Sequence, residues 1–495
     1  MKTPGAILLI SCYELGHQPL NLASPLAFLS QAGYAPAAVD LAVEALDDET
    51  IRRASLVCLS VPMHTALRLA VRVAGRVRDI NPAAKLCFYG LYAPLNAGYL
   101  FEQGADYVIG GEYEQALLGL VESLAAGSPG HPSKQGRSRA GGRPGRDAGA
   151  TGGRPGRDAG ATNIPGVGTP GQVAPPILSR LPFVQPERRQ LPALERYARL
   201  EDGERRAVVG YVETSRGCLH TCLHCPITPV YGGRFFVLPR EVVLGDIRAQ
   251  VQMGAQHVTF GDPDFLNGPG HALKILRTMH AEFPHLTFDA TIKIEHVLEH
   301  RALFKEFKEL GCAFIVSAVE SVSDHILGYL EKGHTLADIV AALDILDAAG
   351  IPMRPSLLPF TPWTSLDDYL DLLAFVEAFG LIGQIDPVHF SIRLLLPPGS
   401  ALLDKPFMLP YLGDLDPAAL TYRWTHPDPT MDRLQQDIAA LVEREARAGT
   451  PPEETFYAIK ALAEEARGLV TAPARQSRVP VAARATPHLT ESWFC

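Results

Sequence analysis

The chain has few cysteines and no long apolar run, and both shortages limit the kind of protein it can be. Eight cysteines among 495 residues are too few for a disulfide scaffold, which crowds its bridges into short secreted domains. No apolar stretch approaches the roughly 20 residues that a membrane-spanning helix needs. The apolar run at residues 6–10 is too short for a secretory signal. We therefore expect a cytoplasmic protein with no membrane partner.

A surplus of positive charge is also missing. The chain has 45 Lys and Arg residues against 54 Asp and Glu residues, which gives a net charge of -9. A general nucleic-acid binder needs a basic surplus to neutralise phosphates, so we expect no general binding to nucleic acid. The length allows two or three domains, and an apolar fraction of 47% is ordinary for a globular protein.

Three of the cysteines lie on one short segment, as Cys218, Cys222 and Cys225. Thiolates at the spacing Cys-x3-Cys-x2-Cys can hold three irons of a cuboidal cluster, and the fourth iron then stays open because no other cysteine is near. An open iron can bind a substrate-like ligand, whereas a fully ligated cluster mainly carries electrons. Zinc is the alternative, with His220 or His224 as a fourth ligand, but both lie inside the same loop, which makes a closed tetrahedron awkward.

This motif resembles the signature of the radical S-adenosylmethionine (radical SAM) superfamily. The resemblance covers about residues 208–396 and, more weakly, the first third of the chain. It implies that the three cysteines bind a 4Fe–4S cluster, that the amino and carboxylate groups of S-adenosylmethionine chelate the open iron, and that one electron cleaves the sulfonium to a 5′-deoxyadenosyl radical. The family places an aromatic residue near the adenine, just before the third cysteine, and His224 fills that position here.

The resemblance also implies partners. Cleavage of S-adenosylmethionine needs an electron donor such as a flavodoxin or a ferredoxin. It needs a substrate for the radical as well, and the sequence does not identify that substrate or any residue that acts on it.

Short apolar runs alternate with helix-like segments in the first part of the chain. Such alternation predicts a doubly wound, Rossmann-like parallel sheet with helices on both faces, in a domain of residues 1–126. Sheets of this kind bind ligands at the carboxyl ends of their strands. The expected strands are residues 6–12, 35–41, 55–61, 85–90 and 107–111, and the expected helices are residues 20–31, 65–78 and 113–125.

Three pieces of this part resemble the cobalamin-binding domain that often precedes a radical SAM core. They are residues 33–41, 58–64 and 108–114. The motif Asp-x-His-x-x-Gly, which supplies an axial imidazole to cobalt in that family, is missing. Two alternatives stay open: cobalamin binds without a protein histidine, or the fold persists without the cofactor. His17 and His64 lie near strand ends and could approach a ligand, although a single loop histidine is more often only a polar residue.

Residues 127–176 are rich in glycine, proline and arginine. The eleven residues 141–151 recur unchanged at 152–162. Such a composition cannot bury enough apolar surface to offset the entropy of ordering the chain. We expect a disordered linker here.

A second series of strand-like and helical segments follows the linker, in residues 200–400. Six strand–helix repeats predict a partial, open (β/α)6 barrel, close to the radical SAM core. Chemistry in barrel folds gathers on the loops after the strands, and the cysteine loop follows the first strand. The expected strands are residues 208–214, 257–261, 286–292, 314–319, 353–358 and 388–395.

The end of the chain is expected to be a mostly helical extension, residues 401–470, and an extended tail, residues 471–495. Amphipathic spacing predicts helices at residues 435–447 and 453–467. The tail ends in Cys495 after two aromatic residues. The whole chain resembles a radical SAM group named for a Cys-Cys/Sec-Ala-Glu-Pro tail, of which only the first residue is present. A selenocysteine codon next would explain this ending, and an ordinary terminus with an incidental thiol is the alternative.

Polar residues after the later strands are candidate ligands of S-adenosylmethionine. Asp262 lies in the loop that the family uses for the methionine amino group, and an acidic turn is the alternative. Glu320 lies where family members reach the ribose or the amino group, and a helix N-terminal acid is the alternative. Lys332 matches a family Lys-Gly-x-Thr, although Thr335 as a helix cap explains part of that pattern.

Two arginines, Arg354 and Arg393, stand inside expected strands. A buried charge is costly unless it is paired, so each should meet an anion. The carboxylate of S-adenosylmethionine or an acidic substrate is one kind of partner, and Glu320 or Asp262 is the other. We count Arg393 among the cofactor-binding candidates.

Together these features predict a radical SAM enzyme with an N-terminal cobalamin-binding-like domain. With cobalamin, the expected reaction is methyl transfer to an unreactive carbon or phosphorus. Without cobalamin, hydrogen abstraction that leads to rearrangement, oxidation or cyclisation is as plausible. The alternative from another class is a non-catalytic iron–sulfur electron carrier or sensor.

Overall fold

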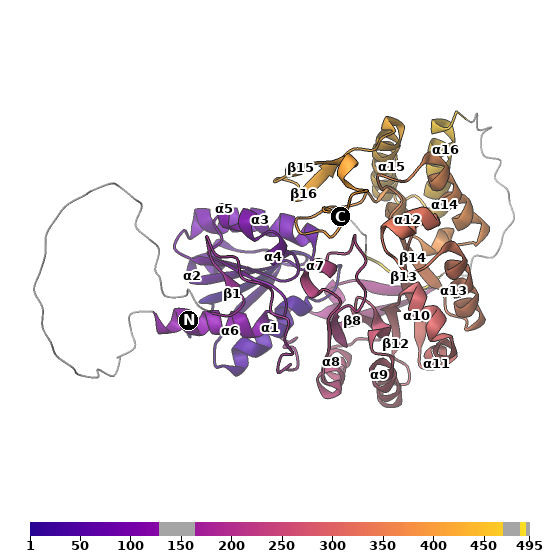
Figure 1. Ribbon diagram of the computed structural model, residues 1–495. Helices are drawn as coiled ribbons and strands as arrows, with labels where there is room; N and C mark the ends of the chain where they lie inside the picture. The colour runs from indigo at the N-terminus through magenta and orange to yellow at the C-terminus, as the bar shows by residue number, and fades with distance from the viewer. Residues whose placement is uncertain (128–163, 469–485, 492–495) are drawn as a thin grey trace, which may run out of the picture.

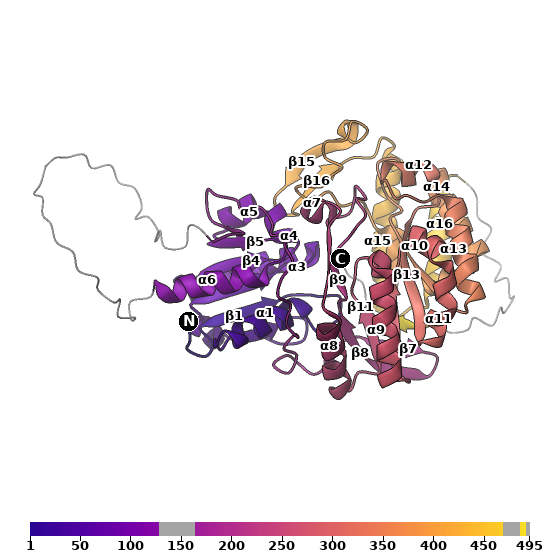
Figure 2. The same ribbon diagram turned by 60° about the horizontal axis from the view of Figure 1, so that its bottom comes forward.

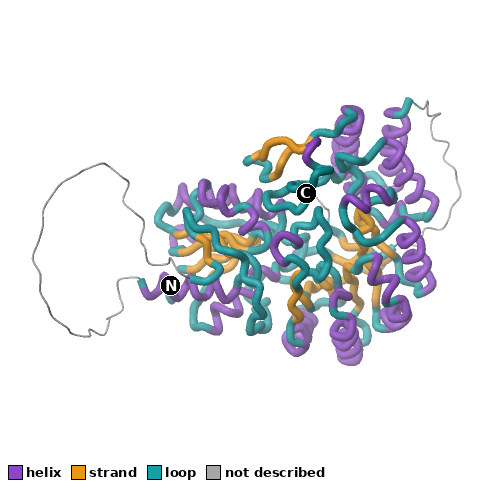
Figure 3. Tube along the Cα trace, viewed as in Figure 1, coloured by secondary structure: helices purple, strands orange, loops and turns teal. Residues whose placement is uncertain are grey.

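The computed structural model describes residues 1–127, 164–468 and 486–491. Two α/β units lie side by side, the first drawn in indigo and purple and the second in magenta to brown (Figure 1). Each unit has its strands in the centre and its helices outside (Figure 3). Within the described residues, no helix is both long and apolar enough to cross a membrane.

The first unit is built on a six-stranded sheet of order β2-β1-β3-β4-β5-β6. The first five strands in sequence are parallel, and β6 is antiparallel to β5. All five expected strands are confirmed. The strands are β1 (Ile7–Ser11), β2 (Ala37–Asp40), β3 (Leu56–Ser60), β4 (Lys85–Tyr89), β5 (Tyr107–Ile109) and β6 (Val167–Gly168).

Helices cover both faces of this sheet because apolar residues of β1 alternate between two cores. Leu8 and Ile10 pack in the core on one face, and Ile7 and Leu9 pack in the core on the other. The doubly wound prediction is confirmed. The first core also holds α2 (Asp48–Arg53), α3 (His64–Ile80), α4 (Tyr92–Leu95) and α5 (Ala97–Glu102), and the second holds α1 (Leu20–Gln31) and α6 (Glu114–Ala126).

The strand order of the first sheet reverses at β1, since β2 lies on one side of it and β3 on the other. In open α/β sheets, ligands bind at such a switch point, outside the carboxyl ends of the strands. The loop after β1 is therefore the place to look for a ligand site in this unit.

Residues 164–176 differ from the sequence prediction, which assigns them to the linker. They contain β6, and Ile177 donates a backbone hydrogen bond to Gly110 at 3.0 Å. Pairing with the open edge of β5 satisfies backbone groups that a linker would leave to water. A strand of two residues gives no periodic signal, which explains the error in the boundary. Residues 128–163, with the whole repeat, lie outside the described residues.

The second unit is built on a seven-stranded sheet of order β14-β13-β12-β11-β8-β7-β17. Five strands from β8 to β14 are parallel and form a half-barrel, and β7 and β17 add an antiparallel edge. The strands are β7 (Arg199–Asp202), β8 (Arg205–Val212), β11 (His257–Phe260), β12 (Thr287–Thr291), β13 (Cys312–Glu320), β14 (Met353–Leu357) and β17 (His488–Leu489).

Helices line the outside of the half-barrel (Figure 2). Their apolar faces share one large core with the parallel strands. Residues 294–309 form three short helical pieces rather than one long helix. The helices are α8 (Arg240–Gln252), α9 (Pro269–Glu282), α10 (Ile294–Glu299), α11 (Phe304–Glu309), α12 (Asp324–Tyr329), α13 (Leu336–Ala348) and α14 (Leu366–Ala378).

The sixth expected strand, residues 388–395, does not form. Its start is the 3-10 turn η6 (Pro387–Ser391), and only Arg393 pairs with Phe360, through a single parallel bridge. Proline at the first position fixes φ and favours the start of a helical turn over a strand. The barrel therefore has five parallel strands and one bridge.

The C-terminal extension contains the two expected helices, α15 (Pro429–Ala448) and α16 (Pro452–Ala466), and a hairpin that the sequence did not predict. The hairpin pairs β15 (Leu412–Asp416) with β16 (Thr421–Trp424). Its tip reaches the first unit, where Leu420 is buried in the core beside α3. His64 Nε2 donates a hydrogen bond to the Ala419 carbonyl at 2.7 Å. The hairpin thus joins the two units.

The tail also returns to the body of the protein. β17 pairs with β7, and the Tyr13 hydroxyl donates to the Glu491 carboxylate at 2.5 Å. Burial raises the pKa of Glu491 to about 7. Cys495 lies outside the described residues, so the expected selenocysteine after it stays a prediction, which the nucleotides after its codon test.

Candidate active site

The cysteine loop lies at the carboxyl end of β8, in the mouth of the half-barrel. β9 (Ser215–Gly217) pairs with β10 (Phe235–Val237), so the segment that carries the cysteines begins and ends at the same place. Cys218 and Cys222 are buried, Cys225 is half-buried, and none of them forms a disulfide. Burial raises the pKa of Cys225 to about 11. A metal bound here must therefore displace protons from the thiols.

One glycine shapes the entry to the loop. Gly217 has φ of +78°, and a Cβ at this position would lie 2.4 Å from the carbonyl oxygen of Arg234. Any side chain would push the first cysteine away from β10. Glycine is therefore required directly before Cys218 for steric reasons.

Two buried ammonium groups accompany the thiols. Lys293 Nζ lies 3.8 Å from Cys222 Sγ. Burial acts to lower the pKa of Lys332, but the nearby Glu320, Cys222 and Cys225 outweigh it and raise the pKa. Only 8% of Lys293 and 3% of Lys332 is exposed. Thiolate ligands bring negative charge, which buried cations stabilise strongly in a low-dielectric site. The donor set and its surroundings therefore fit an iron–sulfur cluster.

Three of the candidate ligands for S-adenosylmethionine come together beside the loop. The Glu320 carboxylate lies 3.3 Å from His224 Nε2 and 3.3 Å from Lys332 Nζ. Burial acts to raise the pKa of Glu320, but Lys332 and His224 outweigh it and hold the pKa at about 2. The site therefore presents an ionised carboxylate next to the cysteine loop.

The backbone of Glu320 is strained. Its φ is +64°, and the pairing of β13 with β14 shifts register between Ala318 and Glu320. A non-glycine residue in this conformation costs about 1–3 kcal/mol and persists only where its surroundings hold it. The shift turns the Glu320 carboxylate towards the cysteine loop.

Asp262 is buried at the end of β11 and holds the strand that leads into the cysteine loop. It accepts hydrogen bonds from the Thr214 amide at 2.9 Å, the Thr214 hydroxyl at 2.7 Å and the Ser215 hydroxyl at 2.5 Å. Burial raises the pKa of Asp262 to about 7. The side chain thus positions β9, and the part of this loop in binding S-adenosylmethionine stays a prediction.

Arg393 is placed away from these groups. Its guanidinium lies 2.6 Å from Asp432, donates to the Trp424 carbonyl at 2.8 Å, and lies 3.5 Å from the centroid of the Trp424 ring. Arg354 pairs with Asp386 at 3.1 Å. Of the expected protein partners, neither Glu320 nor Asp262 pairs with these arginines, which meet Asp386 and Asp432 instead. Arg393 packs on Trp424 of the C-terminal extension, and its part in binding S-adenosylmethionine stays a prediction.

A buried charge network that the sequence did not predict joins the cysteine loop to the first unit. Arg216, just before the loop, lies 2.9 Å from Glu213, 2.7 Å from Glu114 and 3.3 Å from Glu112. The Tyr231 hydroxyl donates to Glu112 at 2.9 Å, and burial raises the pKa of Glu112 to about 7. The sequence analysis singled out residues 108–114 for their resemblance to a cobalamin-binding domain. It did not predict their pairing with Arg216, because Arg216 lies about a hundred residues further along the chain.

Lys293 and Asn267 were missed as well. Asn267 accepts a hydrogen bond from the Leu219 amide at 3.2 Å, which holds the cysteine loop against the end of β11. Lys293 is the second residue after β12, the third parallel strand. A charged residue at that place was a usable signal, because chemistry in barrel folds gathers where strands end.

The loop after β1 carries buried polar atoms at the switch point of the first sheet. The Ser11 hydroxyl, Glu14 Oε1 and Gln18 Oε1 receive no hydrogen bond from any described residue. Burial raises the pKa of Glu14 to about 8, so this carboxyl is neutral and able to donate. Buried polar groups are rarely left unpaired. These three residues therefore fit a polar ligand at the edge where a cobalamin would lie.

His17 and His64, the two histidines near this edge, both contact other residues of the protein. His64 is bonded to the Ala419 carbonyl, and His17 stacks on Tyr211 with ring centroids 4.7 Å apart. Burial lowers the pKa of His17 to about 4. The hydrogen bond to Ala419 thus occupies the Nε2 atom with which His64 could have approached a ligand.

Comparison with known proteins places the cysteine loop in a known domain. Residues 212–374 match the Radical SAM superfamily domain. An uncharacterized methyltransferase of Pyrococcus horikoshii is 27% identical over 189 residues, which is 38% of this chain and 40% of the relative. A tRNA-2-methylthio-N(6)-dimethylallyladenosine synthase of Alkalilimnicola ehrlichii is 23% identical over 203 residues, 38% of this chain and 44% of the relative. The chain thus spans less than half of the length of these relatives.

Two solved structures share the architecture of both units. The cobalamin-dependent S-adenosylmethionine radical enzyme OxsB, with aqua-cobalamin and S-adenosylmethionine bound, has a TM-score of 0.66 at 13% identity and covers 93% of this chain and 71% of its own. The methyltransferase TsrM of Kitasatospora setae has a TM-score of 0.57 at 17% identity and covers 76% of this chain and 71% of its own. These likenesses confirm the expected fold, a doubly wound α/β domain followed by a partial (β/α) barrel.

Proposed function

We propose that this protein, a radical SAM enzyme, holds a 4Fe–4S cluster on Cys218, Cys222 and Cys225 and uses it to cleave S-adenosylmethionine. The observation that carries the proposal is the cysteine loop itself, which sets three thiols at the carboxyl end of β8 opposite the buried ammonium groups of Lys293 and Lys332. A cluster held there supplies the single electron that produces a 5′-deoxyadenosyl radical.

Glu320 and His224 are the residues we assign to S-adenosylmethionine. The Glu320 carboxylate is ionised and buried next to the loop. An ionised carboxylate accepts strong hydrogen bonds from ribose hydroxyls or from an ammonium group. Lys332 keeps Glu320 charged and in place. The strained backbone of Glu320 supports this role, since strain of this kind collects at functional sites.

For the outcome of the reaction we propose methyl transfer assisted by cobalamin. The unpaired polar atoms of Ser11, Glu14 and Gln18 at the switch point support a cofactor in the first unit. These residues would hold its polar parts, and no histidine is assigned to the cobalt because His64 is bonded to the hairpin. Bound cobalamin would supply a methyl group carried on cobalt. A substrate that is changed without cobalamin, by rearrangement or oxidation, is the alternative.

The partners and the location follow from the same chemistry. The cluster needs an electron donor, and we propose a flavodoxin or a ferredoxin. An oxygen-sensitive cluster also needs a reducing compartment, so we propose the cytoplasm. Fractionation of cells that express a tagged chain tests the location, and reduction of the cluster by purified flavodoxin tests the donor.

Anaerobic reconstitution tests the cluster. The protein should take up about four irons per chain, and the reduced form should give an electron paramagnetic resonance signal that changes when S-adenosylmethionine is added. Cys222→Ser should lose the iron. Cys312→Ser is the matched control, because Cys312 is buried in the core of the second unit, away from the loop. A complete cluster whose electron paramagnetic resonance signal does not change when S-adenosylmethionine is added would favour the electron-carrier or sensor alternative.

A further inference from the structure

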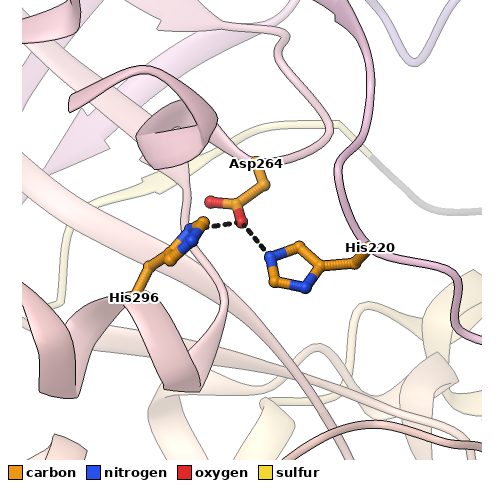
Figure 4. A group of neighbouring side chains, drawn as sticks. All are labelled: His220, Asp264 and His296. Carbon is orange, nitrogen blue, oxygen red and sulfur yellow. Dashed lines mark ion pairs between the residues drawn. The ribbon is translucent and has the colours of Figure 1, made fainter. Parts of the chain in front are cut away.

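A second group of potential metal ligands lies beside the cysteine loop and has no role in the proposed function. It consists of His220, Asp264 and His296 (Figure 4). His220 comes from the cysteine loop, Asp264 follows β11, and His296 lies on α10 after β12. One ligand atom from each residue lies within 4.8 Å of the other two. Three separate segments thus bring two imidazole nitrogens and a carboxylate oxygen to one point.

The three side chains converge on a single oxygen. Asp264 Oδ2 lies 2.6 Å from His296 Nδ1 and 3.3 Å from His220 Nε2. Asp264 is fully buried and only 8% of His296 is exposed. Although these atoms are close, none of the three has a hydrogen bond of acceptable alignment with any described residue. Buried polar atoms nearly always make hydrogen bonds, whereas these three meet as ion pairs without that alignment. A cation bound by all three atoms would satisfy them together.

The other ring nitrogen of His220 gives independent support. His220 Nδ1 lies 3.4 Å from Glu295 Oε2, and Lys293 Nζ lies 2.5 Å from the same carboxylate oxygen. Histidines that bind a metal commonly direct their second nitrogen to a carboxylate, which fixes the tautomer and the ring orientation. His220 has this arrangement, with Nε2 towards Asp264 and Nδ1 towards Glu295.

We propose that His220 Nε2, Asp264 Oδ2 and His296 Nδ1 bind one divalent first-row metal ion. Two imidazoles and one carboxylate suit Mn²⁺, Fe²⁺ or Zn²⁺ and leave further coordination positions open. Mg²⁺ and Ca²⁺ are disfavoured because they prefer oxygen ligands. The ion joins the cysteine loop to the ends of β11 and β12, and His220 is the residue through which it holds the loop.

Mn²⁺ is the probe that separates this ion from the cluster, because it prefers nitrogen and oxygen ligands to thiolates. The anaerobically reconstituted, oxidised holoenzyme is titrated with Mn²⁺, and the six-line signal of the free ion is followed by electron paramagnetic resonance. We expect one Mn²⁺ per chain. We also expect hyperfine coupling from two imidazole nitrogens in pulsed spectra of the wild-type protein, which requires no variant.

Variants then assign the ligands. Asp264→Asn and His296→Gln should each weaken Mn²⁺ binding at least tenfold, while the iron content stays at the wild-type value. His300→Gln is the matched control, since its ring contacts His296 but does not belong to the group. Absence of stoichiometric Mn²⁺ binding, or spectra without imidazole coupling, would overturn the proposal and leave a plain His296–Asp264 ion pair. Loss of iron in the cysteine variants tests the cluster separately.

Discussion

The Glu320 carboxylate and the Lys332 ammonium lie 3.3 Å apart across twelve residues of sequence, one at the end of β13 and the other before α13. Both are buried. The pair holds a residue with φ of +64° in its strained conformation and leaves one carboxylate next to the cysteine loop. Breaking such a pair leaves an uncompensated buried charge, so the pair fixes the geometry on which the proposed S-adenosylmethionine site depends.

Glu320→Gln should weaken the binding of S-adenosylmethionine and leave the cluster intact. Loss of a charge-assisted hydrogen bond costs about 1.5–3 kcal/mol, so we expect Kd to rise by roughly one to two orders of magnitude. Titration calorimetry on the reconstituted protein measures this. Glu331→Gln is the matched control, because Glu331 is an exposed neighbour that pairs with Lys405. An unchanged Kd for Glu320→Gln would assign Glu320 to the end of the following helix instead.

Arg216→Met should destabilise the protein strongly. The change leaves Glu112 and Glu114 buried without their cation, and removing one partner of a buried ion pair costs about 3–5 kcal/mol. Urea unfolding followed by fluorescence measures the shift. Arg240→Met, which removes an exposed pair with Glu241, should leave the midpoint unchanged because exposed pairs contribute little. Equal midpoints for the two variants would contradict the network that joins the two units.

Cobalamin, where bound, should show no imidazole nitrogen on cobalt. His64 is bonded to the Ala419 carbonyl, and the sequence has no axial-ligand motif. Protein expressed with cobalamin available should therefore give the absorbance of a base-off corrinoid, and His64→Phe should give the same spectrum. A base-on spectrum that His64→Phe abolishes would show that the first unit has been misread. Absence of any corrinoid would favour the cobalamin-independent reaction.

Docking of the tail should weaken as pH rises. Burial raises the pKa of Glu491 from an ordinary value of 4.5 to about 7, so the docked tail binds a proton that the free tail releases. The stabilisation is complete below about pH 4.5 and is lost progressively up to about pH 7. Hydrogen exchange at the Thr490 amide, corrected for the intrinsic rate, should be faster at pH 8 than at pH 6 by on the order of tenfold. Glu491→Gln should remove the difference, and an equal difference in that variant would refute this origin.

Local patterns in the sequence predicted most of the fold. Strand–helix alternation placed all five parallel strands of the first unit, and residues 20–31 were predicted as the helix that α1 forms. The pattern failed where tertiary contacts decide. β6 exists because β5 offers an open edge, and residues 388–395 turn away from the sheet at Pro387. Neither feature produces a periodic pattern of apolar residues from which it could have been predicted.

The candidate site divides in the same way. The cysteine spacing is local, so the sequence alone predicted the loop that is proposed to bind the cluster. Glu320, His224 and Lys332 were singled out one by one, but only the structure places His224 and Lys332 each 3.3 Å from Glu320. The sequence did not reveal that Arg393 pairs with Asp432, because Asp432 lies 39 residues further on. Pairs of distant charges cannot be read from one sequence.

Formation of 5′-deoxyadenosine tests whether this protein cleaves S-adenosylmethionine by a radical route. The reconstituted protein is reduced anaerobically with dithionite in the presence of S-adenosylmethionine, and the products are separated by liquid chromatography and mass spectrometry. We expect 5′-deoxyadenosine and methionine in equal amounts with the wild-type protein and with Cys312→Ser, and neither product with Cys222→Ser. A complete, reducible cluster that yields no 5′-deoxyadenosine, or equal yields with and without Cys222, would contradict this expectation.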